Sequence, residues 1–520
     1  IKPDHKSTGV CIMNRRIAYL AMACMTVLLS ACADMGNIKP QSQRIDANTL
    51  GSGTVISQAA VNDAAQWPQQ QWWHAYGDPQ LDALIATALS DSPNLHIAEA
   101  RVRQAQSFAG MAESATLPNV SASTSMTRQL FSAHDFIPPP EAGNYAWYNR
   151  VAVEATYDLD LWGRHRQELA AALDEVKVSS AESQMARLAL ENNIVRSYVQ
   201  LSLQFALKDI AEDTLAHREK GLQVMRKRLA AGLATEMDVT QLEAAIPPLH
   251  IQIEQYDEAI VVLRNQLAAL SGKGPAEGEK ITRPTLALDN NAWLRLPAVL
   301  PADLIGRRPD VAARRWGVEA AGKQIEAAKA AFYPDINLMA FIGFQGIGFA
   351  NFLKGDSSIR GIGPAISLPI FDGGRLRSNL GAHTAAYDIA VESYNGTLIH
   401  ALESVANTLA VAQSLQQQKN LNDGVLVTAS KARTLASKGF AAGMTDFLVL
   451  LNSEVALLTQ EQQRAQITAR MLESHAALML ALGGGYQPEQ VDANEVKPAV
   501  GNTSLDHSAL DNTHPGKDKP

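Results

Sequence analysis

The chain has 520 residues, 46% of them hydrophobic and 6% aromatic, so it is long enough to bury a large core or to form a repeat. Its formal net charge of −8 provides no basic surface for nucleic acid. All three cysteines lie in the first 32 residues. No later segment reaches the roughly 18 consecutive apolar residues of a membrane-spanning helix, which argues against an inner-membrane helical transporter.

The first segment has the layout of a secretory signal peptide. From Met13, a basic start with Arg15 and Arg16 precedes an apolar run that ends at Leu29. The residues before Met13 are interpreted as lying upstream of the true translation start. We therefore expect residues 1–31 to be upstream sequence and signal peptide, absent from the mature chain.

The end of this segment, Leu29-Ser30-Ala31-Cys32, resembles the lipoprotein box of bacterial precursors. In that box the cysteine is acylated and becomes the first mature residue, so Cys32 is expected to carry diacylglyceryl and N-acyl lipid. Ala33 follows it, and the absence of an aspartate there favours the outer membrane over the inner membrane. A secreted protein with a chance cysteine is the alternative interpretation.

The rest of the sequence contains two copies of one unit, at residues 111–273 and 326–486. Each copy runs in the order strand, loop, strand, long helix, glycine interruption, helix and glycine stop. Residues 274–325 form a linker and a helix between the copies, and the polar tail 487–520 is predicted to be disordered. A constant spacing of 211 positions relates three residue pairs: Arg164 and Arg375, Gly232 and Gly443, and Glu243 and Glu454.

Four alternating segments are predicted to be strands, two in each copy. The clearest, Trp147 to Trp162, places mostly apolar residues on one face and polar residues on the other. Four strands cannot close a barrel, and an open edge in lipid leaves backbone groups unpaired, so a membrane sheet of this kind must be completed by other subunits. A soluble antiparallel sheet is the alternative. The other predicted strands are Asn119 to Gln129, Asp335 to Phe349 and Ile359 to Phe371, with loops at Phe136 to Gly143 and Phe352 to Ser358.

Two long segments without proline, Gln167 to Ala230 and Arg375 to Ser437, are predicted to be helices. At 1.5 Å per residue the first would be about 96 Å long, and its length indicates coiled-coil-like packing. Its alanine-rich sides fit a soluble bundle and a helical tube equally well. Pro247 and Pro248 break the helix after the first glycine interruption, whereas the second copy has no equivalent, so the two hairpins are predicted to differ.

Several motifs, in this order on a duplicated frame, resemble the outer-membrane efflux factors of the TolC type, in their NodT-like lipoprotein branch. The resemblance covers Trp67 to Tyr486. Its pieces are WPQQQWWHAYGDPQLDALIATAL (from Trp67), YDLDLWGRHR (from Tyr157), RRPDVAARRW (from Arg307), AAFYPDINL (from Ala330), LPIFDGGRLR (from Leu368) and LGGGYQ (from Leu482).

The resemblance implies a mixed α and β membrane protein in which three protomers each give four strands to one twelve-stranded barrel. Their helices would continue the barrel as a long periplasmic tunnel. Residues 32–110 would form an N-terminal periplasmic segment, of which Asp78 to Ala109 would belong to an equatorial belt around the tunnel together with the C-terminal part. The protein would be a lipid-anchored homotrimer in the outer membrane of a Gram-negative bacterium.

The implied function is a passive exit duct of a tripartite efflux pump, which exports drugs or other small toxic compounds. An inner-membrane pump would supply the energy, and a periplasmic adaptor would join pump to duct. The alternatives are the duct of a type I protein secretion system and a lipid-tethered periplasmic coiled-coil adaptor. In the family, a triplet at each hairpin tip docks the adaptor, and the matching residues here are Ala231, Gly232, Leu233, Ala442, Gly443 and Met444.

Some members of the family close the tunnel mouth with acidic residues just after the second triplet. Here Val449 and Asn452 stand six and nine residues after Gly443, so a hydrophobic and amide constriction is expected instead of a cation-selective mouth. In the first copy Asp238 stands six residues after Gly232, where a tip-closing contact or a solvated helix charge would both fit. No catalytic motif, metal-ligand spacing or cofactor motif is recognised, so we expect no enzyme activity.

Overall fold

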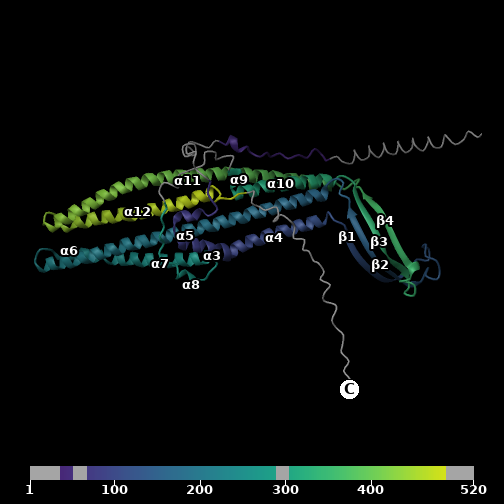
Figure 1. The fold of residues 1–520 in the computed structure, drawn as a ribbon, viewed down its shortest axis with the longest axis horizontal. Helices are drawn as coiled ribbons and strands as arrows, with labels where there is room; N and C mark the ends of the chain where they lie inside the picture. Colours follow the sequence, from purple (N-terminus) through teal and green to yellow (C-terminus); the bar gives the residue numbers. More distant parts are fainter. Residues whose placement is uncertain (1–34, 51–66, 289–303, 488–520) are drawn as a thin grey trace, which may run out of the picture.

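The computed structural model describes residues 35–50, 67–288 and 304–487. Long helices extend along the molecule, and a curved sheet stands at one end (Figure 1). The elements in chain order are η1 (Ala47–Thr49), η2 (Trp72–Tyr76), α3 (Pro79–Asp91), α4 (Pro93–Ser114), β1 (Asn119–Leu130), β2 (Tyr145–Asp158), α5 (Arg164–Ala230), α6 (Glu236–Ala244), α7 (Pro247–Leu270), α8 (Pro275–Gly278), α9 (Leu304–Arg307), α10 (Pro309–Ala330), β3 (Asp335–Ile347), η3 (Gly355–Ser357), β4 (Ser358–Ser367), α11 (Arg375–Ala441) and α12 (Phe447–Ala481).

The helical part is built from two hairpins. α5 and α11 each contain 67 residues, and α7 and α12 pack back along them. The second hairpin returns in one continuous helix of 35 residues, whereas the first returns in α6 and α7, with Pro247 and Pro248 at the start of α7. The predicted difference between the hairpins is therefore confirmed. No helix in the described ranges is both long enough and apolar enough to cross a membrane.

Two further helices connect the hairpins to the sheet. α4 packs along α5 and leads into β1, and α10 packs against both α5 and α11 and leads into β3 (Figure 1). α3 lies near the middle of the molecule, and α4 continues alongside α5 as far as the sheet (Figure 1).

The sheet has the strand order β1-β2-β3-β4, and all neighbours are antiparallel. β2 ends at Asp158 and β4 ends at Ser367, both earlier than predicted. After each strand, an aspartate bonds to the first turn of the helix that follows. Asp160 accepts hydrogen bonds from two backbone N–H groups at the start of α5, and Asp372 accepts two from the start of α11. Strand pairing stops because these carboxylates cap the helices.

The pairing register sorts the side chains into two faces. Even-numbered residues of β1, β3 and β4 share one face with odd-numbered residues of β2, as the pairs Thr124–Val151, Val151–Phe344 and Ala340–Ile362 show. We call this the apolar face, because almost all its residues are aliphatic, aromatic or small. The opposite face, called the polar face, carries the serines and Thr127 of β1 and the charged residues of β2. The alternation predicted for Trp147 to Trp162 is thus shared by β1, whereas β3 and β4 also carry apolar residues such as Phe341 and Ile359 on the polar face.

One apolar cluster joins the N-terminal segment to both hairpins. Trp72 and Tyr76 of η2 pack with Tyr198 of α5, Leu267 of α7 and Ala476 of α12, and all five are buried. We call this the equatorial core. Because it contains side chains from both copies of the repeat, it holds the two hairpins together at this level.

Several polar groups in the equatorial core form hydrogen bonds within it. The hydroxyl of Tyr76 donates to the carbonyl of Leu472 at 2.7 Å, so its oxygen is available to accept from Nδ1 of His475, 3.1 Å away. Burial lowers the pKa of His475 to about 4, which keeps the ring neutral. The hydroxyl of Tyr198 donates to Asp78, which also accepts from the backbone N–H of Thr285. Through this bond to Thr285, the equatorial core also holds the segment that follows α8 in position.

Three consecutive glycines bring the end of the second copy against the first. Gly483, Gly484 and Gly485 have φ values of 86°, 58° and 85°, which L-residues rarely adopt. A Cβ at Gly483 would collide with the carbonyl oxygen of Arg307, and one at Gly484 with the side chain of Leu188 in α5. The backbone can pass here only because these positions lack side chains.

We expect Gly483→Ala to lower the free energy of unfolding by about 1–3 kcal/mol, because alanine disfavours this φ and its Cβ meets backbone. The midpoint of thermal unfolding in detergent measures the change. Gly381→Ala in α11 is the matched control. Its Cβ would meet nothing within 4 Å, and alanine is the better helix former by about 1 kcal/mol. Equal midpoints for the two variants would contradict the prediction.

Candidate functional site: the hairpin tips

Each hairpin tip is a helix C-terminus closed by glycine. Gly232 has a φ of 72°, its N–H bonds to the carbonyl of Leu229, and the N–H of Leu233 bonds to the carbonyl of Arg228. Gly443 has a φ of 71° and the same pair of bonds, to Phe440 and, from Met444, to Gly439. This pattern is the Schellman motif, in which glycine takes the left-handed position after the helix.

The surroundings of the two glycines are open. A Cβ at Gly232 or Gly443 would meet no atom within 4 Å. Glycine is therefore required at the tips by backbone conformation, and no described part of this chain approaches closely. Leu233 and Met444, which follow the glycines, are 70% and 77% exposed. Ala231 and Ala442, which precede them, are the C-cap residues of α5 and α11. The two predicted triplets thus present one large apolar side chain each to solvent.

The helices that leave the tips begin with equivalent caps. Thr235 is the N-cap of α6, and Asp446 is the N-cap of α12. In α6 the cap is a complete capping box, because Asp238 accepts a bond of 2.8 Å from the N–H of Thr235 while Thr235 accepts from the N–H of Asp238. In α12 the carboxylate of Asp446 accepts from the N–H of Val449 at 3.0 Å.

Asp238 therefore has a local role that was not predicted from the sequence. Hydrogen bonds from the backbone and side chain of Thr235 lower its pKa, so the box is charged at neutral pH. Because the shift is downward, the box stabilises the tip above the unfolded-state pKa of aspartate and is lost as pH falls through the lower folded value. Val449 and Asn452, three positions apart on α12, both lie at the surface of the single chain, so no constriction forms within one protomer.

The two tips contact each other through residues that were not predicted from the sequence. The guanidinium of Arg228, near the end of α5, lies 4.5 Å from the ring centre of Phe440, near the end of α11. Phe440 also makes an edge-to-face contact of 5.6 Å with Phe447. A cluster around Met225, Leu242 and Phe447 joins the hairpins at this end. The tips of one protomer thus form one surface, although 211 positions separate them.

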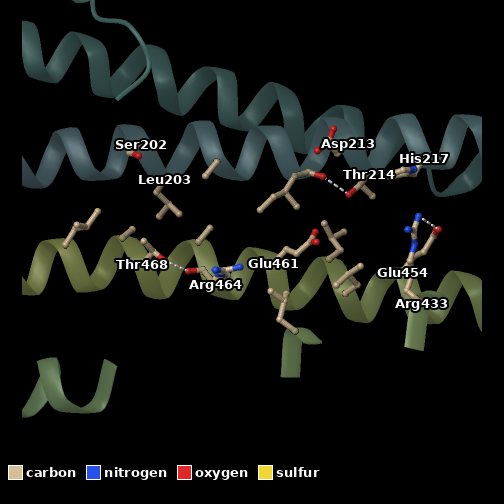
Figure 2. Close-up of a pocket in the computed structure, with 18 of the residues that line it drawn as sticks. Ser202, Leu203, Asp213, Thr214, His217, Arg433, Glu454, Glu461, Arg464 and Thr468 are labelled. Atoms are coloured by element: carbon tan, nitrogen blue, oxygen red, sulfur yellow. Dashed lines mark hydrogen bonds and ion pairs between the residues drawn. The ribbon is translucent and has the colours of Figure 1, made fainter. Parts of the chain in front are cut away.

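Between the tips and the equatorial core, a cavity of about 580 Å³ separates α5 from α11 and α12. Figure 2 shows Asp213 and His217 of α5 on one side and Glu461 of α12 on the other, with the ion pair of Arg433 and Glu454 at one end. Burial raises the pKa of Glu461, and the charge of Asp213 raises it further. The hairpins are therefore in contact at the tips and at the equatorial core, and the cavity between these two levels is lined by both charged and apolar residues.

No cluster of three or more possible metal ligands occurs in the described part of the chain. Cys32, the predicted lipid attachment site, and the predicted signal peptide lie outside the described residues, as does almost all of the predicted tail.

Comparisons with known proteins agree with this architecture. The family model for outer membrane efflux proteins matches residues 84–273 and 300–484. The fusaric acid resistance protein FusA of Burkholderia cepacia is 45% identical over 369 residues, which cover 70% of this chain and 69% of FusA. The multidrug resistance outer membrane protein MdtP of Escherichia coli K12 is 30% identical over 487 residues, which cover 92% of this chain and 98% of MdtP.

Solved structures show the same fold. The crystal structure of the outer membrane protein VceC of Vibrio cholerae has a TM-score of 0.76 and 33% identity, and the match covers 81% of this chain and all of VceC. The outer-membrane channel OprN gives a TM-score of 0.76 at 25% identity over 86% of this chain. These relatives are named for channels and resistance, so at the level of the family the chain is not an enzyme. The chain belongs to the outer membrane efflux protein family and is an efflux channel of the outer membrane.

Proposed function

We propose that three copies of this chain form one passive duct through the outer membrane, which serves as the exit of a tripartite efflux pump. The observation that carries this proposal is the open sheet. β1 and β4 are edge strands whose outer sides have no strand partner in the described chain, and the apolar face beside them exposes Val120, Ile342 and Ile362. In lipid both edges must be paired, so each edge is expected to pair with a neighbouring copy.

The number of copies follows from the interior that a duct needs. Two copies would give eight strands, and a barrel of eight strands is just wide enough to be filled by its own side chains. Three copies give twelve strands and leave an open lumen. The polar face, with Ser121, Ser123 and Ser125 of β1, would line this lumen, and the apolar face would contact lipid. The helices, about 100 Å long at 1.5 Å per residue, would extend the lumen into the periplasm.

The cargo is proposed to be drugs or other small toxic compounds. Relatives are named for resistance to fusaric acid and to multiple drugs, which favours small molecules over a secreted protein. In this proposal the duct itself is passive. An inner-membrane pump supplies the energy for export, and a periplasmic adaptor joins that pump to the hairpin tips.

Adjacent residues on opposite faces test the barrel. In a background with cysteine only at Cys32, Ser125→Cys on the polar face should let a water-soluble thiol reagent reduce single-channel conductance in a planar bilayer. Thr124→Cys on the apolar face is the control and should not respond. Equal responses, or a purified wild-type protein that never conducts, would contradict the shared barrel.

The same recordings examine the tunnel mouth, which we propose to be a hydrophobic and amide constriction formed by Val449 and Asn452 of the three copies, with Asp238 nearby. Asn452→Asp should shift the reversal potential towards cation selectivity, because it adds a ring of carboxylates to the constriction. An unchanged reversal potential would place the constriction elsewhere.

Ala231, Gly232 and Leu233, with Ala442, Gly443 and Met444, are proposed to dock the adaptor. The open space at both glycines and the exposure of Leu233 and Met444 support this role. We expect Met444→Glu to weaken adaptor crosslinking about tenfold and to reduce drug resistance, because a buried charge without a partner is costly. Gly443→Trp should have the same effect, but its positive φ also strains the helix end.

Gly424→Trp provides the control for docking. Gly424 lies on α11 away from the tip, its backbone is exposed, and a Cβ at this position would meet nothing within 4 Å. The variant should leave adaptor crosslinking unchanged. If Met444→Glu and Gly443→Trp both retain crosslinking and resistance while trimers form normally, the tips are not the docking site.

Cys32 is proposed to anchor the mature chain by lipid. Its sequence context supports this role, and the outer-membrane location of the family is compatible with it. Metabolic labelling with radioactive palmitate should label the wild type and not Cys32→Ala. Continued labelling of Cys32→Ala would exclude this anchor.

A further inference from the structure

Two arginines stand on the apolar face without partners. Arg128 of β1 and Arg360 of β4 are the only charged residues on that face of the described sheet, and both are exposed. The guanidinium group of neither residue forms a hydrogen bond or ion pair with any residue that the structure describes. By contrast, Arg150 on the polar face is paired with Glu154 at 2.6 Å. A charge that faces lipid is unfavourable unless it reaches polar groups at the membrane surface.

Both arginines lie near the loop end of their strands. Arg128 lies two residues before the end of β1, and Arg360 lies two residues after the start of β4. Two residues of strand span about 7 Å, which a long arginine side chain can bridge to reach the membrane surface. This is the end of the sheet with the loops 131–144 and 348–357, opposite the helices (Figure 1). In an outer-membrane protein with periplasmic helices, it faces the outer leaflet.

The two arginines also lie on the two edge strands. Within one protomer β2 and β3 separate β1 from β4. If the barrel closes as proposed above, on which this inference rests, β4 of one protomer lies beside β1 of the next. Arg360 and the neighbouring protomer's copy of Arg128 then share one outer surface, with Met126 and Ile362 below them. Closure would create such a pair at every subunit junction.

We propose that each junction binds the phosphate group of an outer-leaflet lipid between Arg360 and Arg128. Guanidinium groups form bidentate hydrogen bonds with phosphate, and two of them would neutralise a phosphate monoester. The acyl chains of the lipid would lie against the exposed apolar residues further along β4, Ile362 and Ile366, which are 83% and 67% exposed. A phosphorylated glycolipid fits because its phosphate lies at the level where its acyl chains begin.

Native mass spectrometry of the full-length trimer in detergent, with diphosphoryl lipid A as the probe, tests this site. We expect one lipid at each junction of the wild type. Arg128→Gln and Arg360→Gln should each weaken retention about tenfold, and the double variant should retain none specifically. Lys354→Gln is the control, because Lys354 is a cation of the nearby loop that already bonds to Asn351. It should behave as the wild type.

The outcomes separate the site from the duct. A conducting trimer whose double variant retains diphosphoryl lipid A as well as the wild type overturns the lipid site and leaves the duct intact. Equal binding of dephosphorylated lipid A overturns it as well, because the phosphate would then contribute nothing. A wild type without a trimer mass and without conductance overturns the duct, and with it a site made from two protomers.

Discussion

Unpaired backbone at the two edges of the sheet is the constraint on which the rest of the architecture depends. Water can satisfy an exposed strand edge, but hydrocarbon cannot. This constraint is the reason for the proposal that an outer-membrane channel whose chain supplies four strands is completed by copies of itself. The same requirement agrees with the clear alternation of apolar and polar residues in β1 and β2, because the proposed barrel would present one face to lipid and the other to a lumen.

Duplication solves a second problem, the connection between a sheet and long helices. Each copy contributes one pair of strands and one helical hairpin, and β2 pairs with β3 across the boundary between copies. The equatorial core and the glycines 483–485 then join the copies again at a second level. Contacts at the tips, such as that of Arg228 with Phe440, join the copies at a third level. The long hairpins are therefore held at three places, with the cavity between two of them.

Much of this architecture could be predicted from the sequence. Alternation located the strands, the absence of proline located the long helices, and the constant spacing of equivalent residues related the two tips. The ends of β2 and β4 could not be placed, because they depend on Asp160 and Asp372 folding back onto helix starts. Contacts between the tips could not be found either, since Arg228 and Phe440 meet only after both hairpins have packed. The capping bond of Asp238 could have been predicted, because a threonine followed three positions later by an acidic residue is a capping pattern. The equivalent position in the second copy is Val449, so that copy does not repeat the pattern.

The break at Pro247 has a consequence for symmetry. One hairpin of each protomer returns through a short helix and a proline break, and the other returns through a single helix. In the proposed ring of three copies, six tips would surround the mouth, but adjacent tips would differ in shape and in chemistry. The ring would have threefold and not sixfold symmetry. A partner that covers all six tips would have to accommodate two kinds of site, either with two kinds of contact surface or with one surface that adapts to both.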